Sequence, residues 1–210
     1  TIQVRTPWSL IDQMPVTLLG THQLTNATLA VTVIDYLRQQ GVPLEDSQMR
    51  QGMTRLKWPA RIELVQKNPP VVIDTAHNGA SIEALVETLA ASFPQTNRIL
   101  IFAATKDKDV GEMLETLLPS FQTVILTQYL SNPRRIPVEE LVELTRAVQL
   151  STGNTSQLSI TDSPETAWLQ AKDMLTPDAL ICVTGSFFIA AELRELLLGT
   201  TDEVLVSEPC

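Results

Sequence analysis

The densest group of chemically useful side chains in this sequence follows a short apolar run. The β-branched run 71–74 ends in the carboxylate of Asp74, and His77 and Asn78 follow three and four residues later. If a helix begins there, its free N–H groups and positive dipole end favour an anion, while Asp74 could hold a cation or a hydroxyl group. Capping of that helix by Asn78 or Ser81 would not explain His77, which is one of two histidines in the chain. We therefore interpret this loop as functional.

Other loops could contribute to the same chemistry. Residues 106–109 are Lys-Asp-Lys-Asp, which could steer a phosphate or a carboxylate substrate. A solvated charge cluster with Asp109 as a helix N-cap fits that pattern equally well. Residues 184–186 are Thr-Gly-Ser, a small-residue loop that lets a backbone approach a ligand closely. The adjacent Arg134 and Arg135 could bind an anion, but we interpret them as part of a solvated loop.

These loops are positioned by strands that alternate with helices from residue 61 onward. Five strand-then-helix units indicate an open, largely parallel sheet with helices on both faces. The runs 61–66 and 71–74 flank a proline-containing turn and predict one antiparallel hairpin at the start of the sheet. The predicted fold is doubly wound α/β, in which ligands bind at the carboxyl ends of the strands. The other predicted strands are 99–104, 123–127, 158–160 and 179–184, and the predicted helices are 81–93, 109–118, 137–149, one beginning at 163, and 187–198.

Residues 1–60 follow a different pattern. They contain a possible strand at 2–4, a helix at 22–40 and a shorter helix at 45–55, without strand–helix alternation. We expect a segment of this size to be too small to bury its apolar faces alone. We interpret it as the end of another domain.

The composition of the 210-residue chain argues against two classes of partner. The 15 Lys and Arg against 24 Asp and Glu give a net charge of −9, which repels a phosphate backbone, so we expect no nucleic acid. Apolar stretches such as 179–183 fall far short of the roughly 20 residues that span a bilayer, so we expect no membrane partner. The two cysteines form no disulfide framework, and we predict a cytoplasmic protein.

Several well-known binding motifs are missing from the sequence. It contains no G-x-x-x-x-G-K-[ST] loop, no G-x-G-x-x-G after a strand and no Cys/His metal cluster. We therefore predict no metal ligands in this chain. The sequence opens Thr-Ile-Gln-Val without a methionine, so we expect it to be part of a longer protein.

Five motifs in order give the chain a resemblance to a known family. They are Leu-Gly-Thr-His-Gln-Leu-Thr-Asn-Ala at 19–27, Trp-Pro-Ala-Arg at 58–61, Asp-Thr-Ala-His-Asn at 74–78, Lys-Asp-Lys-Asp at 106–109 and Val-Thr-Gly-Ser at 183–186. Together they resemble the C-terminal part of folylpolyglutamate synthase, including the bifunctional dihydrofolate synthase form, within the Mur ligase superfamily. The resemblance covers nearly the whole chain.

The resemblance implies a two-domain, ATP-dependent ligase. Family members have an ATPase domain with a P-loop and magnesium ligands, followed by a Rossmann-like C-terminal domain. They phosphorylate a carboxylate of a folate or dihydropteroate with ATP, and the amino group of L-glutamate attacks the acyl phosphate. Residues 1–60 would then be the end of the ATPase domain and the linker, 61–200 the C-terminal domain and 201–210 a tail. ATP and Mg²⁺ are the implied cofactors, the missing ATPase domain is the implied partner, and the isolated chain is expected to be inactive.

The resemblance also assigns site residues by position. Asn26, Arg61 and Asp74 match family residues that contact ATP. His77 matches a residue near the phosphates and the incoming glutamate, and it is our candidate catalytic residue. A weaker set that matches the loops beside this site is Lys106, Asp107 and Ser186.

Two positions depart from the family pattern. Ala60 replaces the glycine of Trp-Pro-Gly-Arg, and Gly79 replaces the proline of His-Asn-Pro. Gly79 loosens the loop that holds His77, because glycine lacks the fixed φ of proline. Two alternatives remain open: a Mur ligase of cell-wall precursor synthesis, and a non-catalytic anion- or nucleotide-binding α/β module.

Overall fold

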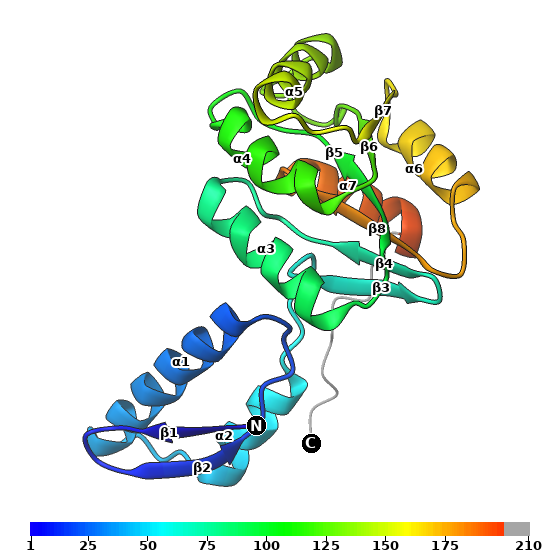
Figure 1. Ribbon diagram of the computed structural model, residues 1–210. Helices are drawn as coiled ribbons and strands as arrows, with labels where there is room; N and C mark the ends of the chain where they lie inside the picture. Colours follow the sequence, from blue (N-terminus) through cyan, green and yellow to red (C-terminus); the bar gives the residue numbers. More distant parts are fainter. Residues whose placement is uncertain (200–210) are drawn as a thin grey trace. The chain divides into compact units, whose positions relative to one another are not determined.

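The computed structural model describes residues 1–199, which fall into two compact units (Figure 1). The first unit is Thr1–Pro59 and the second begins at Ala60. The tail expected at 201–210 lies outside the described residues.

The second unit is built on a six-stranded sheet with the strand order β3-β4-β8-β5-β6-β7. β3 pairs antiparallel with β4, and every other pairing in the sheet is parallel. The predicted α/β fold and its antiparallel hairpin are therefore confirmed. The strands are β3 (Glu63–Lys67), β4 (Pro70–Ile73), β5 (Asn97–Phe102), β6 (Thr123–Leu126), β7 (Gln157–Ile160) and β8 (Ala179–Thr184).

Helices cover both faces of this sheet because its central strands are apolar on both sides. Along β5, Leu100 contributes to the core under one group of helices, whereas Ile99 and Ile101 contribute to the core on the other face. α3, α4 and α5 pack on the first face and α6 and α7 on the second. The helices are α3 (Gly79–Ser92), α4 (Val110–Leu117) with a short 3₁₀ turn (Leu118–Ser120), α5 (Val138–Thr152), α6 (Pro164–Asp173) and α7 (Phe187–Leu198).

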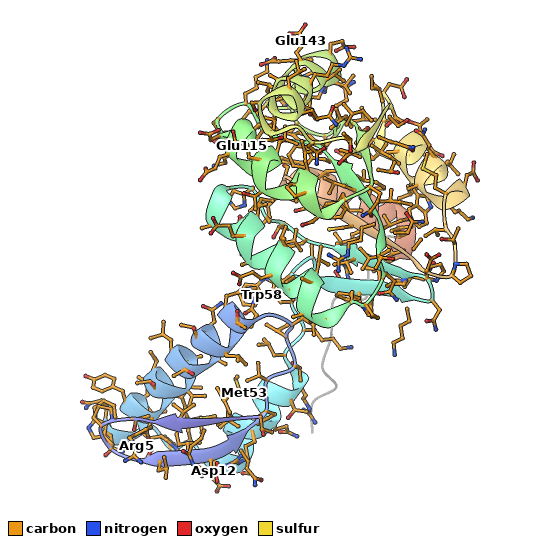
Figure 2. All side chains as sticks on the ribbon, in the orientation of Figure 1. Arg5, Asp12, Met53, Trp58, Glu115 and Glu143 are labelled. Carbon is orange, nitrogen blue, oxygen red and sulfur yellow. The ribbon has the colours of Figure 1, made fainter. Side chains whose placement is uncertain are left out.

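The polar surface of this unit lies on the outer sides of its helices. Figure 2 shows Glu115 on α4 and Glu143 on α5 at the outer surface. Inside, burial raises the pKa of the Cys182 thiol well above its usual range, and the nearby charge of Asp74 adds to that effect. Cys182 is therefore a protonated core residue and not a nucleophile.

The first unit is a two-stranded hairpin with two helices. β1 (Ile2–Arg5) pairs antiparallel with β2 (Leu10–Met14), and α1 (Thr21–Gln39) and α2 (Asp46–Arg55) follow. Met53 on α2 is buried against α1 and the hairpin, whereas Asp12 lies on the outer edge (Figure 2). The sequence analysis did not predict β2, since Leu-Ile-Asp-Gln-Met has no clear alternation. Among residues 1–199, no helix is long and apolar enough to cross a bilayer.

Candidate functional site

The candidate site of the second unit is formed where β4, β8 and β5 end side by side. Their neighbouring positions in the parallel sheet bring the three following loops to one edge. The N–H of Gly185 donates to the carbonyl of Ala76 at 3.0 Å, which joins the β8 loop to the β4 loop. The hydroxyl oxygens of Thr105 and Ser186 lie 3.4 Å apart, which joins the β5 loop to the β8 loop. Thus the predicted loops at 74–78, 103–109 and 184–186 form one surface.

Asp74 holds the loop that carries Arg61. Its Oδ2 accepts from the N–H of Ile62 at 2.9 Å and its Oδ1 accepts from the N–H of Ala76 at 2.7 Å. The carboxylate is only 5% exposed. The buried carboxylate of Asp74 therefore fixes the backbone next to Arg61, a predicted site residue 13 positions earlier in the sequence.

The backbone around Arg61 is strained. Ala60 has φ = 53° and Ile62 has φ = 48°, so both neighbours adopt the left-handed region that side chains disfavour. The structure thereby gives a physical reason for the glycine that the family usually has at position 60. Strain of this kind persists only where the surrounding contacts enforce it. Here the N–H of Thr75 donates to the carbonyl of Ala60, in addition to the Asp74 contact.

A second carboxylate anchors the same loop from the side of α7. Glu63 Oε2 accepts from the N–H of Ala60 at 2.7 Å, and the guanidinium of Arg194 donates to both Glu63 oxygens at 2.8 and 3.1 Å. Burial raises the pKa of Glu63, but the Arg194 and Ala60 hydrogen bonds outweigh it, so the pKa of this carboxyl is lowered. The sequence analysis did not identify this pair, because its members are far apart in the chain and each resembles an ordinary surface charge.

Glu63→Gln is expected to reduce the free energy of unfolding by about 1 kcal/mol at neutral pH, a modest value because both partners remain partly exposed. Since the pKa of Glu63 is lower in the folded state, its stabilisation is complete above the unfolded-state value near 4.5 and is lost as the pH falls through the folded-state value. Urea titrations at neutral and acidic pH measure this difference. Glu195→Gln, an exposed change on α7 next to Arg194, is the control. A Glu63→Gln deficit that persists at low pH would contradict the ion-pair explanation.

His77 is half-buried and makes two hydrogen bonds within its own loop. Its Nδ1 lies 2.9 Å from the carbonyl oxygen of Thr75, and its backbone N–H donates to the hydroxyl of Ser81 at 3.0 Å. Asn78 is the N-cap of α3, and its side chain accepts from the N–H of Ser81. The predicted capping by Asn78 is confirmed, and it coexists with an imidazole placed at the edge of the site.

Gly79 is the first residue of α3 and lies against Glu112 of α4. A Cβ at position 79 would come within 2.3 Å of a carboxylate oxygen of Glu112. Asn78 has φ = −155° and ψ = 165°, the extended conformation that tolerates a following proline, and proline suits the first helical position. The nearest atoms to a Cβ at position 79 therefore belong to the end of the flexible Glu112 side chain.

Gly79→Pro in a Glu112→Ala background is expected to raise the free energy of unfolding by about 0.5–1 kcal/mol, because proline restricts the unfolded chain. In the wild-type background the gain is smaller, since the Glu112 carboxylate must leave the positive end of α3. Thermal and urea unfolding of the four proteins of this double-mutant cycle measure the coupling. Additive effects would show that Glu112 does not oppose residue 79.

Lys106 and Asp107 lie in a loop that pairs with a second loop. The N–H of Lys106 donates to the carbonyl of Arg134 at 3.0 Å, and Asp107 forms an exposed ion pair with the Arg134 guanidinium at 3.2 Å. Arg135 forms an isolated β-bridge with Thr105. The segment with the two arginines is therefore tied to the β5 loop, a contact that the sequence analysis missed. Asp109 caps α4, as predicted.

Ser186 is buried and belongs to a row of hydroxyl groups. Its Oγ accepts from the N–H of Phe188 at 3.1 Å, and it faces Thr105. The hydroxyl of Tyr129 donates to Thr105 at 3.1 Å, and its ring stacks on Phe188. Thr105 and Tyr129 were not among the predicted residues. The signal that points to this row of hydroxyl groups is Tyr129, which lies just after a strand and is fully buried in the structure, so that its hydroxyl needs a partner.

The predicted residue Asn26 belongs to the first unit. Its amide donates to Oε1 of Gln23 at 3.2 Å, and Nε2 of Gln23 lies 2.9 Å from the ring of His22. These contacts arrange three polar side chains in a row along α1. Gln23 and Asn26 are polar lining residues of a cavity of about 270 Å³ that is otherwise largely apolar and includes Trp58. The structure thus places Asn26 at a cavity of its own unit.

Among residues 1–199, no group of three or more His, Cys, Asp or Glu side chains could hold a metal ion. The chemistry that this surface offers is hydrogen bonding and charge: a buried carboxylate, an arginine, an imidazole, a lysine and a hydroxyl. Groups of this kind suit the neutralisation and orientation of oxyanions.

Comparison with known proteins identifies this arrangement. The family described as Mur ligase, glutamate ligase domain matches residues 60–187. The folylpolyglutamate synthase of Lacticaseibacillus casei is 34% identical over 190 residues, which cover 90% of this chain and 41% of that protein. The dihydrofolate synthase/folylpolyglutamate synthase of Bacillus subtilis is 26% identical over 187 residues, which cover 89% and 41%.

Solved structures agree with the sequence relatives. Mycobacterium tuberculosis folylpolyglutamate synthase complexed with ADP matches with a TM-score of 0.81 at 27% identity, over 93% of this chain and 44% of that one. The chain therefore spans less than half the length of these relatives. Because the family match covers more than half of the chain, we conclude that this protein belongs to the Mur ligase family and contains its glutamate ligase domain.

Proposed function

We propose that the chain is the C-terminal portion of an ATP-dependent ligase that adds L-glutamate to a folate. The observation that carries this proposal is the contact of Asp74 with the backbone N–H groups on both sides of the site. It fixes the Arg61 loop to the loop of His77. Within the superfamily, the pairing of His-Gln-Leu-Thr-Asn-Ala at 22–27 with Trp-Pro-Ala-Arg at 58–61 favours the folate branch. Relatives named folylpolyglutamate synthase supply the substrate class.

Each site residue has a distinct task in the proposed reaction. Arg61, Asp74 and Asn26 contact ATP, and His77 lies near the acyl phosphate and the incoming amine. The role is consistent with the geometry, because attack on an acyl phosphate needs charge neutralisation and an oriented amine more than a covalent nucleophile. Lys106, Asp107 and Ser186 form the adjoining wall for the phosphate or the glutamate carboxylates.

ATP would supply the phosphoryl group that activates the folate carboxylate, and Mg²⁺ would neutralise its phosphates. The described residues offer carboxylate, arginine and amide groups to the nucleotide but no metal-ligand set. By the family resemblance, the magnesium ligands would lie on an ATPase domain of the longer protein. A solved relative from Yersinia pestis is complexed with AMPPNP and a Mn ion.

The first unit supports the existence of such a preceding domain. On α1, Leu29 is 65% exposed and Val33 is 49% exposed, although the opposite side of the helix is also apolar and packs into the core. A helix with apolar residues around its circumference is typical of the interior of a larger domain. We propose that residues 1–60 are the end of the ATPase domain and the linker, in a cytoplasmic enzyme.

A turnover assay with ATP, folate and L-glutamate tests the proposal. The isolated chain is expected to show no ligation, whereas the longer protein encoded by the same gene, with its P-loop, is expected to form the glutamyl product and ADP. Ligation by the isolated chain would refute the division into two domains. A cell-wall precursor, offered as the acceptor in place of folate, tests the other branch of the family, and preference for it would overturn the folate assignment.

A further inference from the structure

The imidazole of His77 is held through one nitrogen. Nδ1 lies 2.9 Å from the carbonyl oxygen of Thr75. A carbonyl oxygen can only accept a hydrogen bond, so Nδ1 must carry the hydrogen. Within residues 1–199, Nε2 makes no hydrogen bond of its own. In the neutral ring, Nε2 is therefore left as an acceptor.

An aromatic side chain from another loop packs against the same imidazole. The rings of His77 and Phe187 have centroids 5.0 Å apart and planes tilted by 48°. Phe187 is the first residue of α7 and is 50% exposed, which is unusual for phenylalanine and leaves one side of its ring toward solvent. Such a tilted geometry is among the favourable arrangements of aromatic rings.

The backbone fixes these two rings relative to each other. Two residues before Phe187, the N–H of Gly185 donates to the carbonyl of Ala76, the residue before His77. The hydroxyl of Thr184 donates to the same carbonyl at 3.3 Å. The hydrogen bonds that join the β4 and β8 loops therefore hold the backbone of His77 close to that of Phe187, and this places the two rings in contact.

We propose that Phe187 is a positioning residue for His77. Its ring holds the imidazole plane in line with the Thr75 carbonyl, so that the hydrogen stays on Nδ1 and Nε2 is presented as an acceptor for an amino or ammonium group. This inference rests on the proposed function for the identity of the amine, which is that of an amino acid. The ring geometry itself does not depend on the proposed function.

Long-range ¹H–¹⁵N NMR of the ¹⁵N-labelled chain tests the inference directly. The spectrum is recorded at a pH above which the histidine nitrogen signals no longer change. Since the chain has two histidines, a His22→Gln variant assigns the signals. We expect His77 to carry hydrogen on Nδ1, whereas a neutral imidazole in water prefers Nε2. Hydrogen on Nε2 of His77 in the wild-type chain would overturn the inference.

Three variants separate positioning from general packing. Phe187→Leu keeps an apolar side chain at the start of α7, and it is expected to shift the two His77 nitrogen signals toward the average of a mobile ring. Phe187→Tyr is expected to restore them. Phe188→Leu removes an adjacent aromatic ring that stacks on Tyr129, and it should leave His77 unchanged. Unchanged His77 signals in Phe187→Leu would reduce Phe187 to a packing role and overturn the inference.

The kinetic counterpart uses the longer enzyme. Phe187→Leu is expected to lower kcat about tenfold or more, because a misplaced imidazole orients the amine or transfers its proton less well. The KM for ATP is expected to stay nearly unchanged. An unchanged kcat would also contradict the positioning role. Because the NMR experiment needs no turnover, failure of the ligase assay and failure of the tautomer assignment are separate results.

Discussion

Replacement of Gly185 by alanine is expected to destabilise the second unit by about 3 kcal/mol or more, the largest effect of any single change considered for this protein. Gly185 has φ = 109°, which costs a residue with a Cβ roughly 1–2 kcal/mol or more. An added Cβ would also lie 2.5 Å from the ring of Phe102 and 2.6 Å from the carbonyl oxygen of Ala103, and overpacking of this kind typically costs about 1–3 kcal/mol. The backbone oxygen cannot rotate away, so the loop itself must move.

Gly153→Ala is the matched control for this prediction. Gly153 also has a positive φ, 71°, at the end of α5, but a Cβ there would meet nothing within 4 Å. Its replacement is expected to cost only about 1 kcal/mol, the conformational penalty without the collision. Urea unfolding of the two variants measures the difference. Equal effects would show that the close approach of the β8 loop to β5 contributes nothing.

Asp74→Asn is expected to cost about 2–4 kcal/mol, although the two side chains have the same shape. Both carboxylate oxygens accept backbone hydrogen bonds in a buried place. The amide nitrogen of asparagine must face one of these N–H groups and leaves it without an acceptor. We also expect the loop of Arg61 to be released, because the N–H of Ile62 lies next to a strained left-handed backbone that the carboxylate enforces.

Asp109→Asn tests whether loss of charge alone explains that result. Asp109 accepts from the N–H of Glu112 as the N-cap of α4, on the surface, and asparagine caps helices about as well. We expect a change within about 0.5 kcal/mol. Urea unfolding measures stability, and amide hydrogen exchange at Ile62 and Ala76 shows whether the loop opens. Normal protection of both amides in Asp74→Asn would contradict the proposed anchor.

The periodicity of the sequence was sufficient to predict the α/β fold of the second unit. Continuous β-branched runs such as Val71–Ile73 can be buried only inside a sheet covered on both faces, and helical spacing follows each of them. The chemistry of the caps is equally local, so Asn78 and Asp109 were both candidate N-caps, and the structure has them in that role. β2 was missed because its five residues combine polar and apolar positions without alternation, and only pairing with β1 makes them a strand.

The sequence by itself determined which residue types follow each strand, and therefore which side chains could meet at the carboxyl edge of the sheet. Only the tertiary structure decided their partners. The insertion of β8 between β4 and β5 brings Phe187 to His77 and Ser186 to Thr105, and the packing of α7 near β3 brings Arg194 to Glu63. Local preference acts over a few neighbouring residues, whereas these contacts join positions that are 81 to 131 residues apart. These distant pairs form only because the strand order and the packing of the helices bring their loops together.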